Sequence, residues 1–183
     1  MCLISDKYIE LNRQLHKENV DYGSIGAKWA QHLTNLIHIS GVKTVLDYGC
    51  GKGSLYFSLK DLVKDFQNYD PCVEEFSKEP HSAQLVICTD VMEHVEPENT
   101  DKVLFDIKRL SERMVFFNIS LRPAVKTLPD GRNTHINLHS TNWWVRKLID
   151  HFEILELGLV GSQKGENKET IYDSFCFTGQ RMW

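Results

Sequence analysis

Three glycines at alternate positions, Gly49, Gly51 and Gly53, follow directly on the short apolar segment 44–48 and precede a helical pattern. Glycine adopts backbone conformations that other residues avoid, and its missing side chain lets a ligand lie against the main chain. The start of a helix after such a loop offers free backbone N–H groups to an anionic group. The segment therefore predicts an α/β fold that binds a small ligand at the end of its first strand.

Short apolar runs alternate with helical patterns from residue 42 onwards, which is typical of a parallel sheet covered on both faces. The last two strands should pair antiparallel, because the polar turn 161–167 between them is too short for a crossover helix. The expected strands are Thr44–Tyr48, Phe66–Asp70, Leu85–Thr89, Val115–Ile119, Glu153–Leu159 and Tyr172–Gly179, and the expected helices of the core are Ser54–Val63, Thr100–Arg113 and Thr141–His151.

Length and composition favour one domain. The chain has 183 residues, of which 42% are hydrophobic, and this suffices for a core of its own. We expect 1–40 to form a helical N-terminal cap, in which 22–29 closes over a bound cofactor, and 41–183 to form the core. The formal net charge of −4 gives no overall attraction to nucleic acid or to an acidic membrane. Scattered cysteines, and the lack of a signal-like or membrane-spanning apolar stretch, favour a cytoplasmic location.

Two carboxylates flank the glycines. Asp70 lies at the end of the second expected strand, just before Pro71, where an acid of an open α/β fold accepts hydrogen bonds from ribose hydroxyls. Asp47 immediately precedes the glycines and suits an ammonium group of the ligand. The spacing G-x-G-x-G differs from the G-x-G-x-x-G of nicotinamide enzymes, and the chain lacks room for a second dinucleotide-binding half and a substrate domain.

Segment 85–97 adds a D-x-x-E-H pattern to these features. From about Val42 to Phe177 the chain thereby resembles class I S-adenosylmethionine (SAM)-dependent methyltransferases, which implies a Rossmann-like, three-layer α/β fold with an N-terminal helical extension. The chain departs from the family in 72–82, which is too short for the usual helix and strand that carry an adenine-contacting acid. The resemblance implies SAM as cofactor, bound by Asp47, Gly49, Cys50, Gly51, Gly53, Asp70 and Asp90.

The reaction centre is expected between segments 90–94 and 120–135, because ligands of open α/β sheets lie beyond the carboxyl ends of the strands and loops as long as 120–135 are usually functional. Glu93, His94 and His135 are the candidate catalytic residues, since such side chains can take up a proton near neutral pH. The alternative is that Glu93 and His94 shape the pocket through bonds to the backbone. The candidate substrate-binding residues of the loop are Arg122, Lys126, Arg132 and Asn133.

The predicted function is methyl transfer from SAM to oxygen or nitrogen of a small-molecule acceptor. Two alternatives stay open: a nucleic-acid or nucleotide methyltransferase, favoured by the basic loop residues, and a SAM-binding protein without catalysis. The sequence leaves the identity of the acceptor and the oligomeric state open. Asp90, Glu93, His94 and His135 also resemble the metal-binding arrangement of small-RNA 2′-O-methyltransferases; such a divalent ion would activate a hydroxyl, but it is not favoured.

Overall fold

A six-stranded sheet in the order β2-β1-β3-β4-β6-β5 forms the centre of the computed structural model, which describes residues 3–164 and 170–182. Strands β1 to β4 run parallel, and β6 is antiparallel to both β4 and β5. This confirms the mostly parallel sheet and the antiparallel final strand. The strands are β1 (Thr44–Tyr48), β2 (Asp65–Tyr69), β3 (Ala83–Thr89), β4 (Ser111–Ser120), β5 (Phe152–Lys164) and β6 (Thr170–Arg181).

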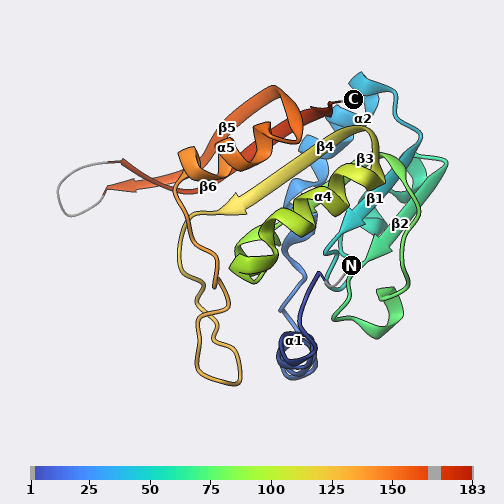
Figure 1. The fold of residues 1–183 in the computed structure, drawn as a ribbon. Helices are drawn as coiled ribbons and strands as arrows, with labels where there is room; N and C mark the ends of the chain where they lie inside the picture. The colour runs from blue at the N-terminus through green and yellow to red at the C-terminus, as the bar shows by residue number, and fades with distance from the viewer. Residues whose placement is uncertain (1–2, 165–169, 183) are drawn as a thin grey trace.

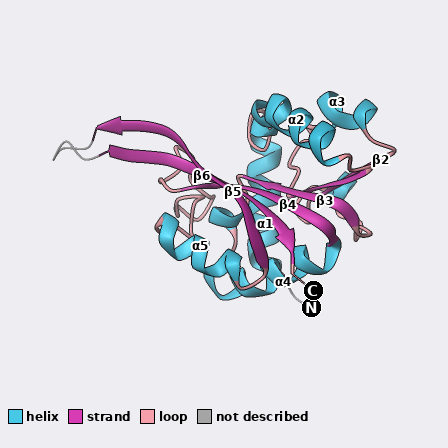
Figure 2. Ribbon diagram, turned by 90° about the horizontal axis from the view of Figure 1, so that it is seen from above, coloured by secondary structure: helices cyan, strands magenta, loops and turns pink. Residues whose placement is uncertain are grey.

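Helices cover both faces of the sheet and complete a three-layer sandwich (Figure 2). Helices α2 and α3 lie on one face, and α4 and α5 lie on the other. The α-helices are α1 (Asp6–Glu18), α2 (Ala30–Ser40), α3 (Tyr56–Leu59), α4 (Thr100–Leu110) and α5 (Thr141–Ile149). The 3-10 helices are η1 (Ile25–Trp29), η2 (Lys60–Leu62), η3 (Glu74–Phe76), η4 (Met92–His94) and η5 (Pro97–Asn99). Among the described residues, no helix is long and apolar enough to cross a membrane.

The two N-terminal helices have separate positions. Leu33 and Ile37 of α2 are buried in one apolar cluster with Val45 and Leu85 of the sheet, so α2 belongs to the sandwich. Helix α1 instead lies below the sheet, at the end where the parallel strands terminate (Figure 1). The Ser5 side chain caps α1 by accepting a hydrogen bond from Tyr8 N. Of these two helices, α1 is therefore the one that covers the edge at which open α/β sheets bind ligands.

The other face of the sheet holds the larger apolar core. Trp144 and Leu148 of α5 are fully buried in one cluster with Phe117 of β4 and Phe177 of β6. Each such side chain contributes about 1.5–3 kcal/mol by leaving water. Trp143 stacks on His139, with ring centroids 3.6 Å apart.

Three local predictions need correction. The helix expected over 54–63 is only the four-residue α3 followed by η2, because Lys64 N already bonds to Lys43 O as the chain enters β2. Helix α4 ends at Leu110, since Ser111 begins β4. Residues 161–164, expected in a turn, continue β5, which projects with β6 beyond the rest of the sheet (Figure 1). The remaining part of that turn, 165–167, lies outside the described residues.

Candidate functional site

The glycine loop after β1 needs glycine for its backbone angles and for its close neighbours. Gly49, Gly51 and Gly53 have φ values of 76°, 54° and 67°, which side chains disfavour. A Cβ on Gly51 would lie 2.7 Å from Gly23 Cα, and a Cβ on Gly49 would lie 2.9 Å from Val91 Cγ1. The loop is therefore enclosed by the N-terminal segment on one side and by the residues after β3 on the other.

A cavity of about 480 Å³ opens at this loop. Asp70 is 8% exposed and forms part of its wall; its carboxylate accepts hydrogen bonds from Gly51 N at 3.0 Å and Cys72 N at 2.8 Å. Gly53 is not among the residues that line the cavity. Six of the seven predicted cofactor-binding residues do line it: Asp47, Gly49, Cys50, Gly51, Asp70 and Asp90.

Acidic side chains dominate the charge of the cavity wall. Burial, and then the nearby Asp70 carboxylate, raise the pKa of Asp47 to about 7. Burial also raises the pKa of Asp70. Among the described residues that line the cavity, Lys126 is the only lysine or arginine. The wall therefore favours a positively charged ligand. Its carboxylates are Asp21, Asp47, Asp70, Asp90 and Glu96.

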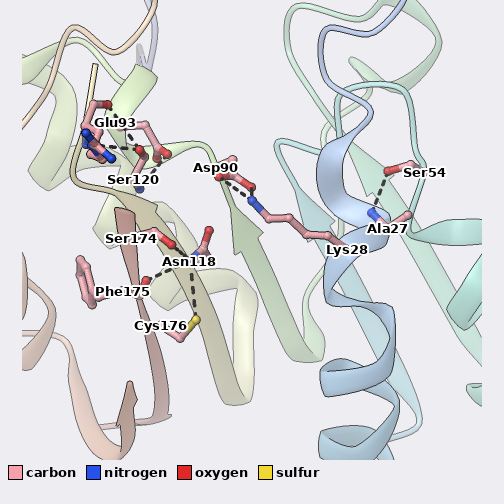
Figure 3. Close-up of polar contacts among 11 residues, drawn as sticks. Ala27, Lys28, Ser54, Asp90, Glu93, Asn118, Ser120, Ser174, Phe175 and Cys176 are labelled. Carbon is pink, nitrogen blue, oxygen red and sulfur yellow. Dashed lines mark hydrogen bonds and ion pairs between the residues drawn. The ribbon is translucent and has the colours of Figure 1, made fainter. Parts of the chain in front are cut away.

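Asp90 joins the end of β3 to the N-terminal segment. Its φ of 56° is unusual for a residue other than glycine, although aspartate tolerates this region better than most. One carboxylate oxygen lies 2.9 Å from Lys28 Nζ of η1, and the Asp90 N–H donates to Asn118 O at 2.9 Å (Figure 3). This ion pair fastens η1 over the carboxyl end of β3.

Segment 21–29 also lies on the glycine loop. Lys52 N donates to Gly23 O at 2.9 Å. Ala27 N donates to Ser54 Oγ at 3.2 Å (Figure 3). Tyr22 and Gly23 of this segment line the cavity. The N-terminal segment thus forms part of the cavity wall, at the place where a closing segment was expected.

His94 and His135 both line the cavity and contact each other, with perpendicular rings whose centroids are 4.7 Å apart. Nδ1 of His135 lies 2.5 Å from Arg122 O. Because a carbonyl oxygen only accepts, Nδ1 carries the hydrogen, which leaves the lone pair on Nε2. Burial lowers the pKa of His135, and lowers that of His94 to about 3, so both rings are neutral at neutral pH. His135 therefore presents a neutral imidazole that can accept a proton.

Glu93 lies outside the cavity lining and bonds to the backbone instead. Its carboxylate accepts a hydrogen bond from Ser120 N at 2.8 Å, and its carbonyl oxygen accepts one from Asn137 N at 3.0 Å (Figure 3). Burial, and then the Asp90 charge, raise its pKa to about 8. Glu93 therefore ties together both ends of the connection 121–136.

Three of the four loop residues expected to bind substrate instead contact neighbouring groups of the protein. Arg122 forms an ion pair with Asp173 at 2.6 Å, and Arg132 forms one with Asp130 at 2.8 Å. The Asn133 side chain bonds to both the N–H and the carbonyl of Ala124. Lys126 alone of the four candidates lines the cavity.

The four residues considered for a metal do not form one site. Asp90 pairs with Lys28 and Glu93 bonds to Ser120, so only His94 and His135 come together. Within the described part of the chain, no group of three or more His, Cys, Asp or Glu side chains could hold a metal ion.

Three cavity residues on α1 were missed by sequence reasoning. Tyr8 and Asn12, 3% and 5% exposed, line the cavity together with His16. Their four-residue spacing could have revealed them as a group, because residues at i, i+4 and i+8 share one helix face.

A mixed sheet in this strand order, with a glycine loop after β1 and an acid after β2, defines the Rossmann-like fold of class I SAM-dependent methyltransferases. No protein-family model matches the sequence, and no curated protein matches it significantly. Many solved structures share the fold.

Magnesium protoporphyrin IX methyltransferase (ChlM) from Synechocystis PCC 6803, with bound SAH, matches with a TM-score of 0.64 at 18% identity, over 85% of this chain and 82% of that chain. The N-methyltransferase NodS from Bradyrhizobium japonicum WM9, in complex with S-adenosyl-L-homocysteine (SAH), has a TM-score of 0.65 at 14% identity, over 98% of this chain and 100% of that chain. A SAM-dependent methyltransferase from Clostridium acetobutylicum ATCC 824 has a TM-score of 0.66 at 12% identity, over 97% of this chain and 99% of that chain. At these identities the similarity establishes the fold.

Proposed function

We propose that this protein is a SAM-dependent methyltransferase that methylates oxygen or nitrogen of a small molecule. The observation that carries the proposal is one cavity that joins the glycine loop and Asp70 to His135. A cofactor site and a proton acceptor are the two parts that methyl transfer to a protonated heteroatom requires. The ChlM and NodS structures, which share the fold, contain SAH.

The charges of the cavity wall fit SAM. SAM has a sulfonium and an ammonium group, and the carboxylates of the wall, Asp47 among them, complement these positive charges. The backbone of Gly49 and Gly51 would receive the methionine end, and Asp70 would bind the ribose. When bound, SAM supplies an electrophilic methyl group. The protein then has to orient the acceptor and remove its proton.

His135 is the residue best arranged for that proton. Its Nδ1–H is engaged with Arg122 O, so Nε2 stays available as a base. His94 packs against the His135 ring, and Tyr22 O–H lies 3.5 Å from His94 Nδ1. We assign the role of base to His135, ring support to His94, and loop anchoring to Glu93.

The small-molecule function is favoured over nucleic-acid methylation. Arg122 and Arg132, which motivated the nucleic-acid alternative, form ion pairs with acidic neighbours. This pairing lowers the local positive charge that a phosphate backbone needs. Only a measurement of turnover distinguishes the proposed methyltransferase from a SAM-binding protein without catalysis.

Calorimetry with SAM tests the first half of the proposal. We expect the wild-type protein to bind SAM and Asp70→Ala to bind it at least about tenfold more weakly, because a charged hydrogen-bonding partner of the ribose contributes about 1.5–3 kcal/mol. Asp61→Asn is the matched control, since the Asp61 side chain is 84% exposed and outside the cavity lining. A folded wild-type protein that does not bind SAM would contradict the proposal.

Turnover tests the second half. Conversion of SAM to SAH in the presence of small-molecule acceptors, followed by mass spectrometry, should show transfer of the methyl group to the acceptor. A protein that binds SAM but methylates none of a broad set of oxygen and nitrogen acceptors would instead support the non-catalytic alternative.

A further inference from the structure

The inward face of α1 is polar where a buried helix face is usually apolar. Tyr8, Asn12 and His16 follow one another at intervals of four residues, and all three line the cavity. The Tyr8 hydroxyl and His16 Nδ1 are buried and make no hydrogen bond of good geometry among the described residues, although the Asn12 side chain lies near the Tyr8 hydroxyl. A buried polar group without a partner costs about 1–3 kcal/mol. Such groups beside a cavity indicate that a ligand completes their hydrogen bonding.

Aromatic rings form a continuous row from α1 to the proposed base. His16 contacts Tyr22 edge-on at a centroid distance of 4.7 Å, and Tyr22 approaches His94 at 6.1 Å. His94 contacts His135 at 4.7 Å. All four side chains line the cavity. Rings prefer offset or edge-to-face contacts with other rings, so this row favours a planar aromatic ligand.

The tyrosine and histidine side chains in this part of the cavity are uncharged at neutral pH. Burial raises the pKa of Tyr8 to about 12 and lowers the pKa values of His16 and His135. The ammonium of Lys126 lies over the Tyr22 ring, 5.7 Å from its centroid. An anionic acceptor would add a negative charge to a cavity that already has five carboxylates, and a cationic acceptor would lie beside the positive charges of SAM.

Helix α1 also limits the size of the acceptor. Ser5 N and Ser5 Oγ donate to the Glu96 carboxylate at 2.8 and 2.7 Å, which fastens the start of α1 beside the cavity. At the other end of the helix, Lys52 Nζ donates to Asn19 O at 2.8 Å. A helix held at both ends beside the site narrows the access to it, which favours a small acceptor over a long polymer.

We propose that α1 selects the methyl acceptor, and that the acceptor is a small uncharged aromatic compound with a ring hydroxyl, bound by Tyr8 and Asn12. This inference rests on the proposed function. Methyl transfer then forms the bond between the hydroxyl oxygen and the methyl carbon, breaks the carbon–sulfur bond, and leaves its electron pair on sulfur. The hydroxyl proton goes to Nε2 of His135.

Three probes that share a ring hydroxyl test the charge preference: phenol, 4-hydroxybenzoate and tyramine. We measure their binding by calorimetry in the presence of SAH, and their methylation by mass spectrometry with SAM. Phenol should bind at least about tenfold more tightly than both charged probes, and it should be methylated on oxygen. Equal or tighter binding of 4-hydroxybenzoate or tyramine would overturn the proposed acceptor class, as would a failure of all three to bind.

Tyr8→Phe tests the role of α1, because it removes only the hydroxyl group. Loss of one hydrogen bond should weaken phenol binding about fivefold and raise its KM, while kcat and SAM affinity stay close to wild type. Glu10→Gln, an exposed change on the same helix, should alter none of these values. Unchanged phenol binding by Tyr8→Phe would refute recognition by α1. Normal SAM binding with failed acceptor tests would leave the proposed function standing, whereas absent SAM binding would remove both.

Discussion

Replacing Glu93 by glutamine should make the stability of this protein less dependent on pH. The Glu93 side chain is fully buried, and its pKa is raised from 4.5 to about 8 by burial and then by the Asp90 charge. In the unfolded chain the carboxyl loses its proton near pH 4.5, whereas in the folded chain it keeps the proton up to about pH 8. The folded state binds more protons within this window, so its stability falls as the pH rises through it.

The expected effect is large enough to measure. One proton bound only by the folded state changes the free energy of unfolding by about 1.4 kcal/mol for each pH unit. Between about pH 5.5 and pH 7.5, the loss of the Glu93 proton should therefore lower the free energy of unfolding by about 3 kcal/mol. The free energy of unfolding of a natural protein is typically about 5–15 kcal/mol in total. Glutamine can still accept the hydrogen bond from Ser120 N, and it has no proton to lose in this range.

Urea unfolding of both proteins at about pH 5.5, 6.5 and 7.5 measures this effect. Asp47 and His94 also change stability with pH, but both are present in the wild type and in the variant, so the difference between the two proteins isolates Glu93. From about pH 5.5 to pH 7.5, the free energy of unfolding of Glu93→Gln should rise by about 3 kcal/mol relative to that of the wild type. A difference that stays constant with pH would show that Glu93 is ionised throughout, and would refute the reasoning.

Three further changes test the core, the base and the glycine loop. Trp144→Ala should lower the free energy of unfolding by about 3–5 kcal/mol, measured by denaturant titration, because it empties a fully buried site. His135→Gln should lower methyl transfer about 10²-fold with unchanged SAM affinity in calorimetry, and near-normal turnover would exclude His135 as the base. Gly51→Val should displace Gly23, increase hydrogen exchange in 21–29 and abolish SAM binding; unchanged affinity in a folded variant would contradict the cofactor assignment.

The sequence alone determined the parts that depend on neighbours along the chain. The run 44–53 predicted β1 and its glycine loop, because a short apolar run and the conformational freedom of glycine are local properties. The short link before β6 determined its antiparallel pairing, and the brief segment 72–82 left no room for another strand. Helix lengths were less predictable: the apolar pattern of 54–63 did not reveal that the backbone leaves the helix after Leu59 to pair with Lys43.

Tertiary structure alone decided which polar side chains belong to the site. Glu93 belongs to the expected segment, yet Ser120 N draws its carboxylate away from the cavity, and Asp173 engages Arg122 in the same way. Tyr8 and Asn12 entered the site because α1 folds under the strand ends. In each case the partner is distant in sequence, and the direction of a side chain depends on contacts that form only when the sheet and the N-terminal helix are assembled.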